Sequence, residues 1–131
     1  MTTAIENIEL DTELQELYLI GKQWLSDLEF LQEELAFLGK LAEITALPEL
    51  HADYEQIFLL EKTHLVLKAD AVEFLKKIEH LIGSPDKAIS IELLEEHVLL
   101  KLQLEDLKEK FRSGRKLLFE MILRVQHERH S

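Results

Sequence analysis

The sequence predicts an all-α protein, an elongated up-down-up antiparallel three-helix bundle with coiled-coil-like heptad seams. Apolar residues make up 47% and charged residues 31% of the chain, which is a globular composition. Four glycines and two prolines supply few of the turns that a sandwich or barrel needs. Leucines recur at alternating spacings of three and four, which is typical of helices that pack along one seam. Residues 1–131 are therefore expected to form a single helical-bundle domain.

The first helix is expected over residues 11–45. Asp11 is a suitable N-cap, because its carboxylate can accept hydrogen bonds from the free N–H groups of a first turn. Pro48 disfavours helical dihedral angles at Leu47, so the helix should end before it. The apolar seam of this helix is Leu10, Leu14, Leu17, Gly21, Trp24, Leu28, Leu31, Leu35, Leu38 and Ala42.

The second helix is expected over residues 49–82. Pro48 is acceptable at the start of a helix, and the run Gly83-Ser84-Pro85 is a strong stop signal. The apolar face of this helix is Tyr54, Ile57, Phe58, Leu65, Ala71, Val72, Leu75, Ile78 and Ile82.

The third helix is expected over residues 86–128, with a start near Asp86 or Ser90. Because both connections between helices are short, sequential helices are expected to run antiparallel. The seam of the third helix is Leu93, His97, Leu100, Leu104, Leu107, Phe111, Gly114, Leu118, Met121 and Val125.

Apolar residues also occur outside the seams. On the first helix they project from the side opposite the seam, and they are Phe30, Phe37, Leu41 and Ile44. A bundle helix buries one stripe, so a second stripe predicts a protein interface, either of a homodimer or with a helical protein partner. The competing interpretation is a broad-faced first helix that lies deeper in the bundle. The third helix carries a smaller surplus in Ile91, Val98 and Leu102.

Three polar residues interrupt the apolar face of the second helix. Glu61, His64 and Lys68 are one turn apart, so their side chains point the same way. One interpretation is a buried polar network that pairs its own charges and fixes helix register, and the other is a wet edge of the bundle. Glu61 and His64 also have the Glu-x-x-His spacing of di-iron bundles. No second such step exists in the sequence and the facing positions are leucines, so no metal site is expected.

Histidine and glycine each occur within a seam. His97 is expected to be a core histidine with its hydrogen bonds satisfied, although His64 and His97 together could sense pH. Gly39 and Gly114 are expected at one level of the bundle, where they make room for bulky residues. The alternative at that level is a notch that holds a small ligand.

The charge of the chain is −11 and unevenly distributed. Residues 1–61 carry two basic and fourteen acidic residues, whereas residues 110–131 carry six basic and two acidic ones. An acidic surface repels phosphates and anionic lipids, so neither nucleic acid nor membrane is an expected partner. The basic end is expected to complement the acidic first segment, within the chain or across a homodimer.

Catalytic motifs are missing from the sequence. There is no cysteine, no Gly-rich phosphate loop, no His-Glu-x-x-His, and no serine in a nucleophile context. Neither an enzyme nor a cofactor is expected, and the absence of an export signal predicts a cytoplasmic protein. The predicted function is a non-catalytic helical interaction or adaptor module that self-associates through the outer face of the first helix. The alternative is a metal- or small-ligand-binding bundle that uses the polar cluster on the second helix.

Overall fold

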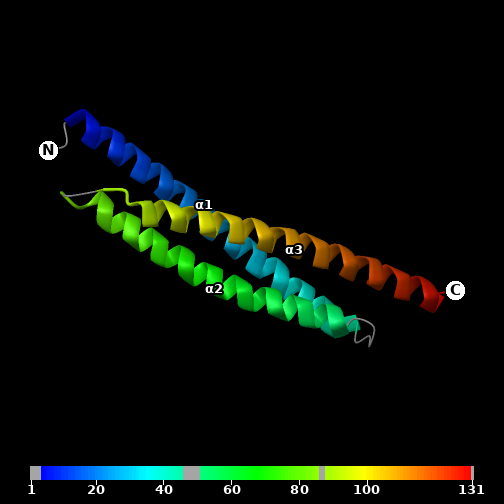
Figure 1. Cartoon of the computed structure of the whole chain (residues 1–131). Helices are drawn as coiled ribbons and strands as arrows, with labels where there is room; N and C mark the ends of the chain where they lie inside the picture. Colours follow the sequence, from blue (N-terminus) through cyan, green and yellow to red (C-terminus); the bar gives the residue numbers. More distant parts are fainter. Residues whose placement is uncertain (1–3, 46–50, 86–87, 131) are drawn as a thin grey trace. The chain divides into compact units, whose positions relative to one another are not determined.

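The computed structural model contains three α-helices, α1 (Ala4–Thr45), α2 (His51–Ile82) and α3 (Ile91–His130) (Figure 1). It describes residues 4–45, 51–85 and 88–130, without the side chains of residues 4–7, 42–45, 51–54, 56, 57, 125, 129 and 130. Within that part of the chain there is no strand, and the all-α three-helix bundle is confirmed. None of the helices, over the same residues, is long and apolar enough to cross a membrane.

The helix ends follow local capping. α1 begins at Ala4, seven residues before the predicted start, so Asp11 lies inside the helix and does not cap it. α2 ends at Ile82, directly before the predicted stop signal. There the N–H of Gly83 still donates to the carbonyl of Glu79, at 3.3 Å.

Of the two predicted starts of α3, Asp86 lies outside the described residues and Ser90 agrees with the structure. Ser90 is the N-cap, because its Oγ accepts a hydrogen bond from the N–H of Leu93 at 3.1 Å. Glu92 lies in the first turn, where a negative charge is favourable near the helix N-terminus. A hydroxyl cap therefore sets this boundary at Ile91.

The chain divides into two compact units. Unit 1 comprises Met1–Leu28 and Leu67–Leu104, and unit 2 comprises Glu29–Val66 and Glu105–Ser131. Each unit contains a segment of all three helices, and the chain reverses direction from α1 to α2 and again from α2 to α3 (Figure 1). The prediction of one folding domain stays a prediction.

The core of unit 1 is a seam of aliphatic side chains with three rings in contact. Trp24 of α1 packs on Phe74 of α2, with ring centroids 5.9 Å apart. α1 also approaches α2 closely at Gly21, where an added Cβ would lie 2.6 Å from Cδ2 of Leu75. The buried hydrophobic residues of this unit are Leu14, Trp24, Leu28, Leu67, Ala71, Phe74, Leu75, Ile78, Leu93, Leu100 and Leu104.

The core of unit 2 is a leucine-rich seam that contains one histidine. α1 and α3 contribute most of the described residues predicted from their heptads, but at the end of α3 Ile122 is buried and the predicted Met121 is half-buried. The buried residues are Leu31, Leu35, Leu38, His64, Leu107, Phe111, Leu118 and Ile122.

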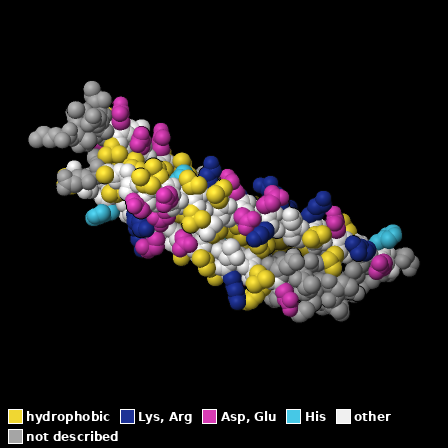
Figure 2. Space-filling view, in the orientation of Figure 1, with side chains coloured by type: hydrophobic (Ala, Val, Ile, Leu, Met, Phe, Trp, Pro, Cys, Tyr) yellow, Lys and Arg dark blue, Asp and Glu magenta, His cyan; other side chains and the backbone are white. Residues whose placement is uncertain are grey.

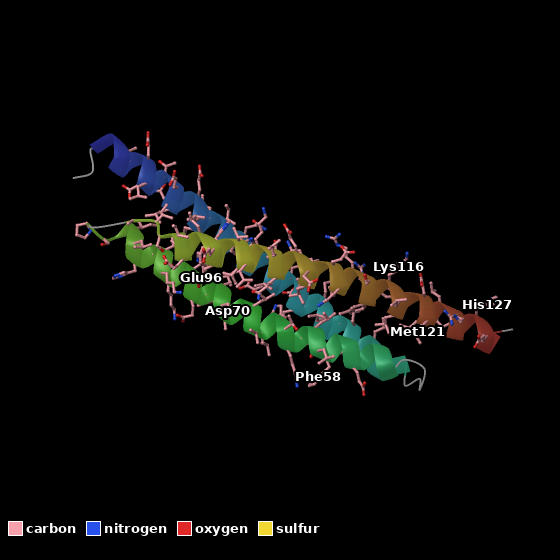
Figure 3. The ribbon with its side chains drawn as sticks, viewed as in Figure 1. Phe58, Asp70, Glu96, Lys116, Met121 and His127 are labelled. Carbon is pink, nitrogen blue, oxygen red and sulfur yellow. The ribbon has the colours of Figure 1, made fainter. Side chains whose placement is uncertain are left out.

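The predicted face of α2 is partly wrong. Leu65 was expected in the core, but it is 60% exposed, and the ring of exposed Phe58 lies 4.8 Å from the Lys62 ammonium (Figure 3). The buried seam is instead His64, Leu67, Ala71, Phe74 and Ile78, an unbroken three-four repeat. Ala71, Leu75 and Ile78 were expected in the core and are buried there, whereas the expected face was turned away from the seam positions His64, Leu67 and Phe74.

Candidate functional site

Two phenylalanines stand on the outside of α1 in unit 2. Phe30 is 61% and Phe37 is 54% exposed, whereas the seam residues of the same segment are buried. Leu41 is half-buried, and the side chain of Ile44 lies outside the described residues. We call Phe30, Phe37 and Leu41 the α1 outer face. Its exposure argues against a first helix that buries both stripes, and a partner that covers it stays a prediction.

The α1 outer face is bordered by carboxylates. Glu33 and Glu34 fall between the two rings in sequence and flank them on the helix surface. The rings are one heptad apart, about 10.5 Å along the axis. Aromatic side chains of this kind are enriched at interfaces, and the acidic border favours a basic partner surface.

A second candidate is a polar groove between α1 and α2 in unit 2. It has a volume of about 240 Å³. His64 is 1% exposed, and Glu61 is half-buried with its Oε1 3.9 Å from the position of a Cβ on Gly39. The groove is lined by Gln32, Leu35, Ala36, Glu61, His64 and Leu65.

The predicted polar network crosses the boundary between the two units. Glu61 and His64 belong to unit 2, whereas half-buried Lys68 belongs to unit 1. The network of all three residues therefore stays a prediction. No group of three or more His, Cys, Asp or Glu residues that could hold a metal occurs among the described side chains. Glu61 and His64 would supply two ligands, fewer than the three or four that a zinc site takes from protein.

A third site is a groove between α2 and α3 in unit 2, where the sequence had pointed only to Gly114. We call it the α2–α3 groove, and its volume is about 370 Å³. Leu59 is 60% exposed and Leu117 is 48% exposed, so its walls are apolar and open to solvent. It is lined by Leu59, Leu60, Thr63, Glu109, Lys110, Ser113, Gly114 and Leu117.

Gly114 was the sequence signal for this groove. A glycine inside a helix costs about 1 kcal/mol relative to alanine, so its position calls for a reason. The predicted partner glycine, Gly39, is not among the lining residues. An added Cβ on Gly114 would find its nearest neighbour, Cδ1 of Leu60, at 4.0 Å, which is ordinary contact. Neither a bulky neighbour nor a notch between the two glycines therefore explains Gly114.

A second apolar surface lies on α3 in unit 1. It includes the predicted surplus residues, and the hollow over it has a volume of about 390 Å³. We call it the α3 apolar patch, and it consists of Ile91, Leu94, Val98, Leu99 and Leu102 beside Glu95. Figure 2 shows hydrophobic side chains interspersed with acidic and basic ones on the visible face of the molecule.

The C-terminal part of α3 presents basic side chains. Residues 110–124 contain five basic residues and one acidic residue, and all five basic side chains are exposed. Lys116 is one of them and is labelled in Figure 3. The Lys110 ammonium pairs with Asp106 of the preceding turn at 2.9 Å, and Arg112 pairs with Glu109 at 3.7 Å. Exposed pairs of this kind are weak and exchange readily.

His97 lies in the aromatic cluster of unit 1. Its ring centroid is 4.9 Å from that of Trp24 and 5.9 Å from that of Phe74. Nε2 is buried without a hydrogen-bond partner among the described residues, so the expected satisfied histidine is not observed. Burial of the ring, and secondly the Lys101 charge, lower the pKa of His97 below its ordinary value.

Comparison with known proteins assigns neither a family nor a function to the chain. No protein-family model, curated protein or solved structure matches the chain. The proposals below therefore rest on the residues and surfaces described above.

Proposed function

We propose that the protein is a non-catalytic helical interaction module that self-associates as a homodimer through the α1 outer face. One observation carries the proposal: two phenylalanines, each more than half exposed, stand one heptad apart on a helix whose other stripe is already buried. Burial of apolar surface is the main favourable term in most protein association. A pair of exposed rings is the kind of side-chain group that dominates interface energetics.

Sedimentation equilibrium of the wild type tests the proposal over a concentration series. We expect a mass of twice the 15.3 kDa of one chain. The variant Phe30→Glu with Phe37→Glu should sediment as a monomer, because it places four charges in each dimer where four rings were buried. Its helicity, measured by circular dichroism, should be retained, since both residues are surface residues in this structure.

The α3 apolar patch offers a matched control. Val98 and Leu102 are 52% and 58% exposed, close to the values of the two phenylalanines. Val98→Glu with Leu102→Glu should leave the dimer intact. If this control dissociates the dimer and the phenylalanine variant does not, the interface lies on α3 and the proposal is wrong. A wild-type monomer at all concentrations, or loss of helicity in the phenylalanine variant, would also contradict it.

The second candidate function is a bundle that binds a small polar ligand or a metal at Glu61 and His64. The observation in its favour is the polar groove, in which Gln32, Glu61 and His64 share one hollow. EDTA in the same sedimentation series separates the two candidates. Self-association through apolar surface is indifferent to the chelator, whereas assembly that EDTA abolishes favours the metal.

A further inference from the structure

The outward side of α3 carries exposed side chains along most of the helix. α3 is one continuous helix, so residues three or four positions apart lie on the same side of it. The side chains opposite its buried seam are exposed, except for half-buried Phe119. We call this row the α3 outer stripe, and it consists of Leu94, Val98, Lys101, Leu102, Glu105, Glu109, Arg112, Lys116, Phe119, Glu120, Leu123 and His127.

The charges of the α3 outer stripe are arranged symmetrically about one point of the helix. In unit 2, Glu105 and Glu109 precede that point, and Arg112 and Lys116 follow it. Three pairs of opposite charge have this point as their midpoint, and they are Glu109 and Arg112, Glu105 and Lys116, and Lys101 and Glu120. A two-fold axis through the point and perpendicular to the helix would place each carboxylate level with a basic side chain of a second copy.

The apolar residues of the stripe have the same midpoint. Under the same two-fold axis, Leu102 would lie level with Phe119 of the second copy, and Val98 with Leu123. Val98, Leu102 and Leu123 are each more than half exposed. Contact between two stripes would therefore remove apolar surface from water at both ends of the charged centre, which is favourable.

The direction of the second helix follows from the charges. A parallel pair of stripes would place each residue level with its own counterpart, so Glu105 would meet a carboxylate and Lys116 an ammonium. The antiparallel pair replaces these repulsions with attractions. Arg112 already pairs with Glu109 of its own helix at 3.7 Å, but that pair is exposed and exchanges readily. The charges thus select the antiparallel register, and the apolar side chains supply most of the affinity.

We infer that the α3 outer stripes of two copies pack antiparallel about the point midway between Glu109 and Arg112. This contact does not use the α1 outer face, so it forms whether or not the proposed homodimer does. Its centre consists of exposed ion pairs, each of which contributes little. It is therefore the weaker contact, and it joins copies only at concentrations above those that complete the proposed dimer.

Engineered cysteines test the antiparallel register, because the natural chain has none. Glu105→Cys and Lys116→Cys are made in separate full-length chains, and both replaced side chains are exposed. In the antiparallel contact each thiol lies level with the thiol of the other variant. Two copies of the same variant would keep their thiols about 16.5 Å apart along the helices, which is too far for a disulfide. The equimolar mixture is oxidised mildly, and mass spectrometry of the digested products identifies each disulfide.

We expect the mixed disulfide to form at least tenfold faster than either symmetric one. Lys62→Cys, at an exposed position of α2 in unit 2, is the control and gives the rate of random collision with each variant. A dominant symmetric product would indicate a parallel contact and overturn the inference. A mixed product that forms no faster than the collision control would overturn it as well. Both outcomes leave the proposed homodimer to be decided by its own sedimentation series.

Exchange of charges gives a second test. Glu105→Lys with Glu109→Lys makes the centre of the stripe wholly basic, so the association constant should fall at least tenfold. This variant is less negative than its parent, so a fall cannot come from the net charge of the chain. Adding Arg112→Glu with Lys116→Glu to the same chain reverses every central pair and restores the net charge. We expect this fourfold variant to recover the association constant of the parent.

Sedimentation equilibrium at protein concentrations up to the millimolar range measures these constants. The parent chain carries Phe30→Glu with Phe37→Glu, so the α1 outer face does not contribute, and circular dichroism checks that helicity is kept. A parent that stays monomeric throughout would overturn the inference. So would a fourfold variant as weak as the twofold one, or a twofold variant that associates as well as the parent.

Discussion

His97 is the residue whose environment differs most from its sequence expectation. Heptad spacing placed it in the seam correctly, but spacing carries no information about hydrogen-bond partners. The side chains that face it from α1 and α2 are the rings of Trp24 and Phe74, which offer no strong acceptor. A neutral imidazole tolerates this environment better than an imidazolium, because a cation loses hydration there and gains no opposite charge.

The free energy of unfolding should therefore fall as the pH falls below about 6.5. The pKa of His97 is lowered in the folded state, by burial first and by Lys101 second, so the unfolded chain binds the proton more readily. The stability contributed by neutral His97 is complete above the unfolded pKa and is lost as the pH falls toward the folded one. Urea unfolding at pH 7.5 and 5.5 measures the loss.

The variant His97→Leu should show a smaller loss between these two pH values. The exposed residue His80 supplies the control, since His80→Gln should keep the full loss. An equal pH dependence of wild type and His97→Leu would mean that His97 is not the group responsible.

The two glycines of α1 should respond in opposite ways to the same substitution. Gly21→Ala puts a methyl group 2.6 Å from a terminal carbon of buried Leu75, and crowding of this kind costs about 1–3 kcal/mol. Gly39→Ala meets nothing closer than the Glu61 carboxylate at 3.9 Å. Both gain about 1 kcal/mol of helix propensity. We expect Gly39→Ala to raise the free energy of unfolding and Gly21→Ala to lower it. Chemical denaturation of both variants measures the sign, and equal signs contradict the packing described at Gly21.

At the scale of the helix, the sequence predicted α1 and α3 well because leucine fills nearly every seam position. It predicted the face of α2 poorly because His64 occupies a seam position and Leu65 does not. Hydrophobicity alone would bury Leu65 and expose His64, which is the reverse of their positions in the structure. His64 is buried because it begins the three-four repeat that continues through Leu67, Ala71 and Phe74. Periodicity over several turns was the stronger signal, and a single polar residue concealed it.

Surface features that depend on one helix could be predicted from the sequence, whereas those that depend on contacts between helices could not. The exposure of Phe30 and Phe37 was predictable, because two stripes on opposite sides of one helix cannot both face a small core. The α2–α3 groove was not, since it depends on which side chains of two helices meet. Gly114 marked the position in the sequence without indicating whether the space above it was filled. The sequence offered Asp86 and Ser90 as starts of α3, and the bond from the Leu93 N–H to the Ser90 hydroxyl identifies Ser90 as the cap.

For the whole molecule, the dominant electrostatic term is the net charge of −11. Four ion pairs, Lys76–Glu73, Lys77–Glu96, Lys110–Asp106 and Arg112–Glu109, each have an exposed lysine or arginine, so each contributes little. One of these pairs joins two helices, Lys77 of α2 to Glu96 of α3 at 3.0 Å (Glu96 is labelled in Figure 3). Repulsion among surplus carboxylates should therefore outweigh these attractions in the folded state.

Added salt should stabilise the folded protein for this reason. Raising the NaCl concentration from about 0.01 to 0.1 M shortens the screening length from about 30 to 10 Å, which weakens long-range repulsion more than short contacts. In the variant Phe30→Ser with Phe37→Ser, which we expect to be monomeric so that association does not contribute, the melting temperature should rise by about 3 °C or more. Glu13→Gln with Glu16→Gln removes two of the surplus negative charges, so it should reduce the rise in melting temperature that salt produces. A melting temperature that falls with salt would show that the ion pairs outweigh the net charge.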